Sequence, residues 1–134
     1  MPTILLDTNA VSDIMRDHPQ VLASVASCRD PITTSAIVVG EIQYGLDRLP
    51  TGKKKLDLTA RAAAILGAIR LVAIADGIAR AYGRLKAASE QQGLNADDND
   101  LWIAATAIEQ GSVLVTRDQI FSRISALQSI DWTV

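Results

Sequence analysis

The sequence PTILLDTNAVSDIM, residues 2–15, places an aspartate directly after a short apolar run. Ile4, Leu5 and Leu6 are branched apolar residues, and such a run is typical of a strand buried within a sheet. Asp7 ends the run. An aspartate at a strand end is commonly a turn former or a helix cap. A functional role for Asp7 therefore depends on what the rest of the chain brings beside it.

The size and composition of the chain indicate one globular domain. The chain has 134 residues, of which 49% are hydrophobic and 21% are charged. These values are typical of a domain large enough to bury a core, so we expect residues 1–134 to form a single domain. No apolar run is long enough to cross a bilayer, and the N-terminus lacks the features of a signal peptide. We therefore expect a cytoplasmic protein that has no membrane partner.

The scarcity of some residue types restricts the chemistry. Cys28 is the only cysteine and His18 is the only histidine, which excludes an internal disulfide, a cysteine zinc cluster and any mechanism that needs two imidazoles. Catalysis would have to use carboxylates, hydroxyls, lysine or a metal. The net charge of −2 and the pI near 5.2 argue against a globally basic nucleic-acid binder, although a local basic patch stays open.

Predicted strands and helices alternate along the chain. The strands are expected at residues 4–6, 31–34, 71–74 and 113–116, and Trp132 is expected to pack in a short edge strand. Ser35 is a suitable cap for a helix over 36–46, a second helix follows the lysines at 53–55, and Asp76 caps a third that Gly93 ends. A fourth runs from about 99 to 110 and stops at Gly111. This alternation predicts an α/β fold, with a mostly parallel sheet of four to five strands and helices on both faces.

Four carboxylates are predicted to gather at one edge of that sheet. Asp7 and Asp118 each follow a predicted strand, Glu41 lies within two turns of the start of the 36–46 helix, and Asp100 lies in the first turn of the last helix. Ligands of open parallel sheets bind beyond the carboxyl ends of the strands, where such residues converge. These four residues are therefore the candidate catalytic residues.

A cluster of like charges is costly unless a cation lies within it. Mg²⁺ or Mn²⁺ is the expected cofactor, with Asp7, Glu41, Asp100 and Asp118 as ligands, because hard cations prefer carboxylate and water oxygens. Without a useful histidine, the simplest nucleophile is a water activated by metal, which favours phosphodiester hydrolysis. Receiver domains and haloacid-dehalogenase-type phosphatases also place acids at strand ends. However, Asn9 stands where the phosphatase needs its second aspartate, and no strand near the C-terminus ends in the lysine of a receiver.

Four blocks of the sequence resemble PIN-domain ribonucleases, in particular the VapC toxins of bacterial toxin-antitoxin operons. The blocks are LLDTNAVSDIM (5–15), TSAIVVGEIQYGL (34–46), NDLWIAATAIEQG (99–111) and LVTRDQIF (114–121). The acidic quartet of that family falls on Asp7, Glu41, Asp100 and Asp118, and Asn9 matches the asparagine of its Asp-Thr-Asn motif. The resemblance implies a PIN-like domain, metal-dependent endoribonuclease activity, homodimers and inhibition by a cognate VapB-type antitoxin.

Several further residues have more than one possible role. Asn9, Ser35 and Thr116 could orient the carboxylates and the waters of the metal, or they could only make local turn and capping bonds. Asp98 is expected either to cap its helix or to support the metal ligands. The candidate RNA contacts are Arg80, Arg84 and Lys86, while the lysines at 53–55 are expected to form a solvated face. A catalytically inactive PIN-like module that binds nucleic acid or a partner protein is the alternative function.

Overall fold

Five parallel strands form one sheet in the order β3-β2-β1-β4-β5. The computed structural model describes residues 2–134. The strands are β1 (Ile4–Leu6), β2 (Ile32–Ser35), β3 (Arg70–Val72), β4 (Val113–Val115) and β5 (Ser129–Ile130). The helices are α1 (Thr8–Met15), α2 (Pro19–Ser27), α3 (Ala36–Asp47), α4 (Lys53–Ala68), α5 (Asp76–Gln92) and α6 (Asp98–Gln110), with a 3₁₀ helix η1 (Gln119–Arg123) before β5. The predicted α/β fold is confirmed, and every strand pairing is parallel.

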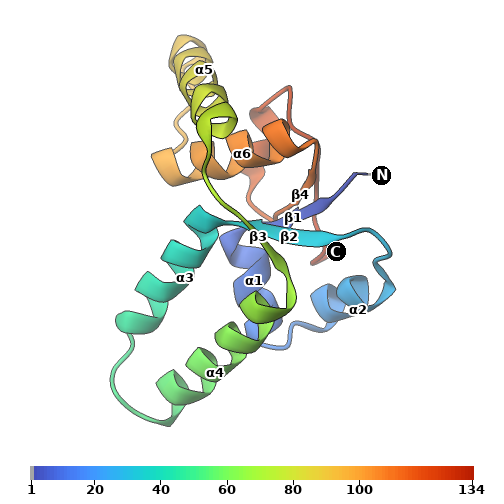
Figure 1. Cartoon of the computed structure of the whole chain (residues 1–134), viewed down its shortest axis with the longest axis vertical. Coiled ribbons are helices and arrows are strands. Elements are labelled where there is room, and N and C mark those ends of the chain that lie inside the picture. The colour runs from blue at the N-terminus through green and yellow to red at the C-terminus, as the bar shows by residue number, and fades with distance from the viewer. Residues whose placement is uncertain (1) are drawn as a thin grey trace.

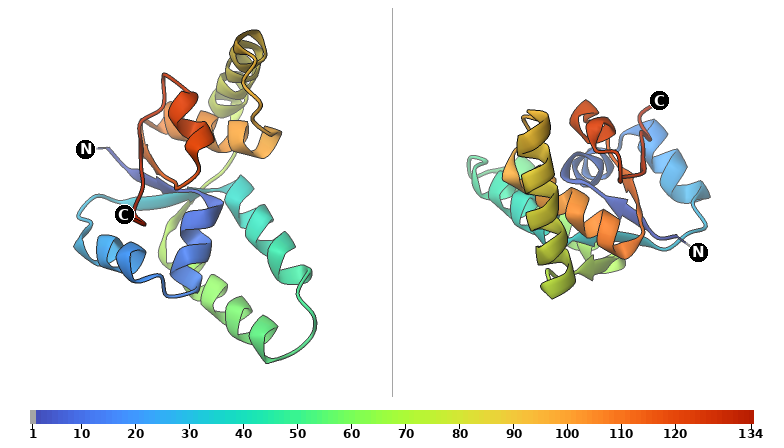
Figure 2. Two further views of the ribbon diagram at one scale, coloured as in Figure 1. Left: turned by 180° about the vertical axis from the view of Figure 1, so that it is seen from behind. Right: turned by 90° about the horizontal axis from the view of Figure 1, so that it is seen from above.

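The helices cover both faces of the sheet. Helices α1 to α4 lie on one face and α5 and α6 lie on the other, with the sheet seen nearly edge-on between them (Figure 1). Helices α5 and α6 pack side by side, as the rotated views also show (Figure 2). Parallel sheets need this covering because their strands are apolar on both sides. Within residues 2–134, no helix is both long and apolar enough to cross a membrane.

The core sits between the sheet and these two helical layers. Leu5 and Leu6 of β1 are almost completely buried, as expected for the central strand of the sheet. Phe121 of η1 also lies in this core, so the segment after β4 is anchored by an aromatic side chain. The largest fully buried apolar side chains of the α-helices and of β4 are those of Ile103, Leu114, Val11, Val21, Val38 and Val115.

Local sequence signals explain where most helices begin and end. The Ser35 hydroxyl accepts a 3.0 Å hydrogen bond from the amide of Ile37 and caps α3. Gly93 and Gly111 end α5 and α6 in the left-handed conformation, with φ of 68° and 64°. Glycine adopts this conformation without steric cost. The predicted caps at these three positions are confirmed.

Some predicted boundaries are wrong. Ala75, not Asp76, is the cap residue of α5, and the Asp76 carboxylate instead pairs with Arg80 one turn later. Trp132 lies in a turn, because the edge strand β5 forms earlier, at Ser129–Ile130. His18 has a structural role, because its ring nitrogen Nδ1 accepts a hydrogen bond from the amide of Val21 and caps α2. Strand β3 covers 70–72 rather than 71–74.

The strand order places a switch point in the middle of the sheet. From β1, the chain adds β2 and β3 on one side and β4 and β5 on the other. The segments that leave the carboxyl ends of β1 and β4 therefore diverge and leave a crevice between them. Asp7 follows β1 and Asp118 follows the β4 segment, so the fold puts two of the predicted site residues at this crevice.

Candidate active site

Asp7 is a buried carboxylate at the start of α1. Its side chain accepts a 2.8 Å hydrogen bond from the amide of Ala10, so the residue is the N-cap of the helix. Only 3% of the residue is exposed. Burial raises the pKa of Asp7 to about 6, against the lowering effect of hydrogen bonds from the Thr116 hydroxyl and the Ala10 amide. The local reading of Asp7 as a helix cap is therefore correct, but capping alone does not explain a carboxylate buried beside other acids.

Asp100 is the predicted site residue that interacts electrostatically with the three other site carboxylates. It lies in the first turn of α6 and is half-buried. Partial burial raises its pKa to about 6, and repulsion from Asp97, Asp118, Glu41 and Asp7 adds to the effect in that order. A carboxylate feels such repulsion only from charges that lie nearby. All four predicted site carboxylates therefore face the same edge of the sheet.

Glu41 is held in place by two side chains from other helices. The Thr8 hydroxyl of α1 donates a 2.5 Å hydrogen bond to Glu41 Oε1. The side-chain amide of Asn99, in the first turn of α6, donates to Glu41 Oε2 at 3.3 Å. Glu41 itself projects from the second turn of α3, so these two bonds fix the carboxylate from both sides.

Asp118 occupies the loop that leaves β4. Its carboxylate accepts a 3.1 Å hydrogen bond from the amide of Ile120 and caps η1, and its own amide donates to the Thr116 hydroxyl at 3.0 Å. The same hydroxyl bonds Asp7. Thr116 therefore links the segments that follow β1 and β4.

The carboxylate oxygens of this site are the type of ligand that a hard divalent cation prefers. Within residues 2–134, no three histidine, cysteine, aspartate or glutamate side chains stand close enough to hold a metal ion together. Mg²⁺, however, is usually held by one or two carboxylates and keeps several waters. Asp7 and Asp100 are the two site carboxylates whose pKa values are raised, first by burial and then by repulsion from other acids, among which Asp118 acts on both. A cation between them would offset that cost, so these two residues are the candidate direct ligands.

The other predicted supporting residues have different surroundings. The Thr116 hydroxyl accepts the amide of Asp118, and Ser35 is buried and caps α3; a role of either residue in orienting the metal ligands stays a prediction. Asn9 lines a cavity of about 160 Å³ together with Glu41. The prediction that Asp98 caps α6 is wrong, because Asp97 is the cap and accepts the amide of Asp100 at 3.0 Å.

Asp98 instead belongs to a contact between α5 and α6. Its carboxylate accepts hydrogen bonds from the Tyr82 hydroxyl at 2.9 Å and from Lys86 Nζ at 3.0 Å. The Tyr82 ring stacks on Trp102 with 3.8 Å between the ring centroids. Asp98 raises the pKa of the Lys86 amine, because it stabilises the ammonium form. Asp98 therefore has partners of its own in Tyr82 and Lys86, and its role in supporting the metal ligands stays a prediction.

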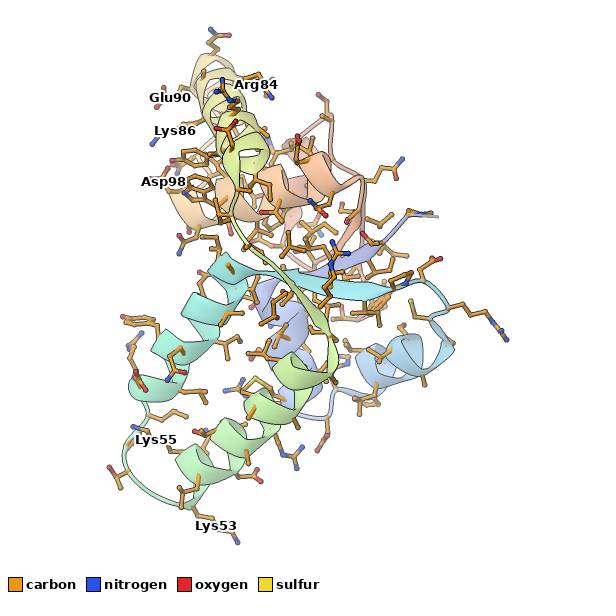
Figure 3. The ribbon with its side chains drawn as sticks, in the orientation of Figure 1. Lys53, Lys55, Arg84, Lys86, Glu90 and Asp98 are labelled. Carbon is orange, nitrogen blue, oxygen red and sulfur yellow. The ribbon has the colours of Figure 1, made fainter. Side chains whose placement is uncertain are left out.

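The predicted RNA contacts lie on α5. Arg80 and Arg84 are exposed, and Arg80 pairs with Asp76 at 3.0 Å. Arg84 and Lys86 project from the same helix (Figure 3). Because Lys86 already pairs with Asp98, it would have to leave that partner or share it in order to bind a phosphate. A role of these residues in RNA binding stays a prediction.

Sequence reasoning missed Thr8, Asn99 and an ion pair between Asp13 and Arg117. Thr8 and Asn99 are the immediate neighbours of Asp7 and Asp100, which is the one signal that could have suggested them. Arg117 Nε lies 3.2 Å from Asp13 Oδ2. No local pattern connects these two residues, because most of the chain separates them.

Comparison with known proteins identifies the family. The model of the PIN domain family matches residues 4–127, which is nearly the whole chain. The chain therefore belongs to the PIN domain family. Among curated relatives, it is 33% identical over 121 residues to the VapC ribonuclease Y4jK of Sinorhizobium fredii, with 86% of each chain covered. It is 30% identical over 132 residues to Ribonuclease VapC2 of Rickettsia felis, with 96% of each chain covered.

Solved structures agree with this assignment. The chain matches the crystal structure of VapBC2 from Rickettsia felis, bound to a promoter DNA fragment, with a TM-score of 0.88 and 29% identity. That match covers 97% of this chain and 98% of the other. The structure of FitAcB from Neisseria gonorrhoeae matches with a TM-score of 0.84 and 28% identity, covering 97% and 98%. The predicted resemblance to PIN-domain proteins of the VapC type is confirmed.

Proposed function

We propose that this chain is a metal-dependent endoribonuclease that acts as the toxin of a toxin-antitoxin pair. The observation that carries the proposal is the set of interacting carboxylates at the switch point of a PIN fold, with Asp100 repelled by Asp7, Glu41 and Asp118. Relatives that align with nearly the full chain are named VapC ribonucleases, which supports RNA as the substrate. In this proposal, residues 1–134 form one PIN domain that acts in the cytoplasm.

The roles of the carboxylates follow from their surroundings. Asp7 and Asp100 would hold Mg²⁺ or Mn²⁺ directly, and Asp118 would complete the acidic site. When bound, the cation supplies charge stabilisation to the phosphodiester and lowers the pKa of water. Glu41 keeps lone pairs free beside its bonds to Thr8 and Asn99. It is therefore placed to accept the proton that the attacking water loses.

A VapB-type antitoxin is the proposed partner. The solved relatives include toxin-antitoxin complexes, such as VapBC2 from Rickettsia felis. An acidic site of this kind suits an arginine of the antitoxin, because a guanidinium fork can bond paired carboxylates and block the site. The toxin itself is proposed to be a homodimer, as the resemblance to VapC toxins implies.

An inactive PIN-like module is the alternative function. Degenerate modules of this kind lack some acidic positions, whereas this chain retains Asp7, Glu41, Asp100 and Asp118. The raised pKa values of Asp7 and Asp100 also indicate a site built at a cost in stability, as is common where chemistry takes place. We therefore favour the enzyme.

A cleavage assay tests the proposal. The purified chain is incubated with total cellular RNA in Mg²⁺, in Mn²⁺ and in EDTA, and new 5′ ends are mapped by sequencing. We expect cleavage only with a divalent cation. The Asp100→Asn chain is the matched control, because the change removes one charge with almost no change in size. Failure of the wild-type chain to cut any RNA in either cation would contradict the enzyme and favour the binding module.

A further inference from the structure

Arg117 is a cationic residue beside the acidic site. It lies between Thr116 and Asp118 in the segment that follows β4. We propose that Arg117 binds a phosphate of the RNA substrate beside the carboxylates, and that Asp13 is the residue that positions it. This inference rests on the proposed ribonuclease function and names a substrate contact for the same site.

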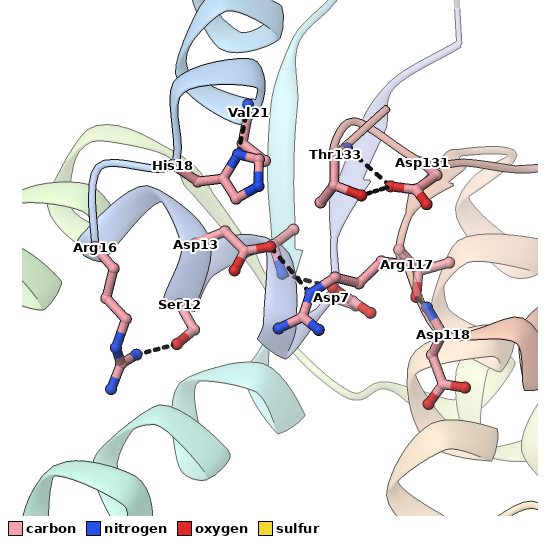
Figure 4. Close-up of polar contacts among 12 residues, drawn as sticks. Asp7, Ser12, Asp13, Arg16, His18, Val21, Arg117, Asp118, Asp131 and Thr133 are labelled. Carbon is pink, nitrogen blue, oxygen red and sulfur yellow. Dashed lines mark hydrogen bonds and ion pairs between the residues drawn. The ribbon is translucent and has the colours of Figure 1, made fainter.

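The ion pair with Asp13 fixes where the guanidinium lies. Arg117 Nε donates to Asp13 Oδ2 at 3.2 Å, and this bond connects the loop after β4 to the middle of α1 (Figure 4). The Asp13 side chain is only 14% exposed, whereas that of Arg117 is 48% exposed. A largely buried carboxylate therefore holds an arginine whose outer part reaches solvent.

The outer part of the guanidinium is available for a ligand. Arginine has five N–H donors in a planar fork. In the part of the chain that the structure describes, the Arg117 side chain makes its hydrogen bond through Nε. The two terminal nitrogens therefore remain as a pair of parallel donors, the arrangement that binds phosphate oxygens in a bidentate manner.

The charge of Arg117 acts on the site. The ion pair of Arg117 with Asp13 joins the loop that carries Asp118 to helix α1, whose N-cap is Asp7, so the positive charge lies between the two segments that hold these acids. A phosphodiester approaching Asp7, Glu41, Asp100 and Asp118 meets four like charges, and a cation on the rim would offset part of that repulsion. Arg117 has this position because the same loop carries Asp118.

The two arginines that were predicted to contact RNA are less suitable for this role. Arg80 and Arg84 project from α5, and Arg80 is paired with Asp76 in an exposed contact within one helix. Such pairs are weak and do not fix the guanidinium. Arg117 is the arginine that a nearly buried carboxylate from another element orients beside the site.

RNA binding without cleavage provides the first test. In an Asp100→Asn background, binding of a fluorescently labelled single-stranded RNA is followed by anisotropy over a range of NaCl concentrations. A lost phosphate contact lowers the slope of log Kd against log salt by about 0.7 for single strands. We expect this decrease for Arg117→Gln. Arg70→Gln is the control: Arg70 begins β3 at the opposite edge of the sheet and pairs with the neutral Gln110, so the slope should not change.

Cleavage provides the second test, in the wild-type background. Arg117→Lys keeps the positive charge but removes the planar guanidinium with its parallel donors. We therefore expect an unchanged salt slope and a cleavage rate that is about tenfold lower. Asp13→Asn should also leave the salt slope unchanged and lower kcat. The charge of Arg117 remains in this variant, but no carboxylate fixes the guanidinium in place.

The outcomes separate this inference from the proposed function. An unchanged salt slope in Arg117→Gln, or a wild-type cleavage rate in Arg117→Lys, would show that Arg117 only joins the loop to α1. The lysine variant keeps the test valid if the glutamine variant does not fold. If the wild-type chain cuts no RNA in either cation, the ribonuclease function is overturned together with the inference.

Discussion

The hydroxyl of Thr8 lies 2.5 Å from Glu41 Oε1 and donates a hydrogen bond to it. Thr8 directly follows Asp7, which caps α1, so the same turn of chain positions two acids of the site. Asp7 is positioned by the end of β1 and by its cap bond. Glu41 is positioned by the hydroxyl of Thr8, the chain neighbour of Asp7. The start of α1 is therefore the element on which the geometry of the site depends most.

Removing the Thr8 hydroxyl should disturb Glu41 alone. Thr8→Val keeps the shape of the side chain but leaves Glu41 with only the longer bond from Asn99. Loss of a residue that supports a catalytic carboxylate typically lowers activity about 10-fold to 100-fold. We expect a fall within this range in the rate of RNA cleavage. Thr59→Val on α4, where the hydroxyl bonds a backbone carbonyl, is the control, and equal rates in the two variants would refute the role of Thr8.

The stability of the cation-free protein should depend on pH through Asp7. Its pKa is about 6 in the folded chain and 3.8 when unperturbed. Between these values the folded state binds more protons than the unfolded state, so stability falls as pH rises. The contribution of Asp7 is fully present below pH 4 and is lost by about pH 7. The loss is about 3 kcal/mol for a shift of this size.

The Asp7→Asn variant isolates this effect. Asparagine also caps helices well, so the cap bond to Ala10 should remain. Urea unfolding in EDTA should show that the variant gains stability relative to the wild type between pH 4 and pH 7. Parallel pH profiles for the two chains would mean that Asp7 is not buried as a charged group.

Divalent cations should stabilise the folded chain. A ligand that binds only the folded state adds roughly 2.7 kcal/mol at a hundred times its Kd. Millimolar Mg²⁺ or Mn²⁺ should therefore raise Tm by several degrees, whereas NaCl of equal ionic strength should not. The increase should shrink in Asp7→Asn, because one candidate ligand has lost its charge. A melting curve that tens of millimolar cation leaves unchanged would argue against the metal site.

Co-expression should reveal the antitoxin. The product of the small gene beside this one should co-purify with the chain and suppress cleavage. If an arginine of that protein enters the acidic site, its substitution by alanine should restore cleavage while the two proteins still bind. The expected contact is with Asp7 and Asp100, so the complex should also prevent the rise of Tm with Mg²⁺. A neighbouring gene product that does not bind would contradict the toxin-antitoxin assignment.

The parts of the fold that could be predicted from sequence have local causes. Strand β1 is a run of apolar residues, Ser35 is a good cap, and Gly93 and Gly111 end helices because they adopt positive φ. The acids at strand ends could be placed at one edge because parallel strands share their direction. Local patterns, one topological rule and the family resemblance therefore led to the carboxylate site, whose roles stay a prediction.

The parts that could not be predicted depend on distant neighbours. Residues 97, 98 and 100 are all aspartates, and the choice of Asp97 as the cap is linked to the pairing of Asp98 with Lys86 on another helix. Strand β5 is only Ser129 and Ile130, which carry no strand signal and pair through the backbone of β4. The contact of Asp13 with Arg117 could not be predicted for the same reason, because the two residues are far apart in the sequence.

The central position of β1 affects when the molecule can become active during its synthesis. Leu6 pairs with Val115, near the other end of the chain, and Asp118 follows that partner strand. A nascent polypeptide on the ribosome holds Asp7 and Glu41 long before β4 and Asp118 have emerged. In the proposed ribonuclease, the acidic site is therefore incomplete until β4 and Asp118 have been synthesised.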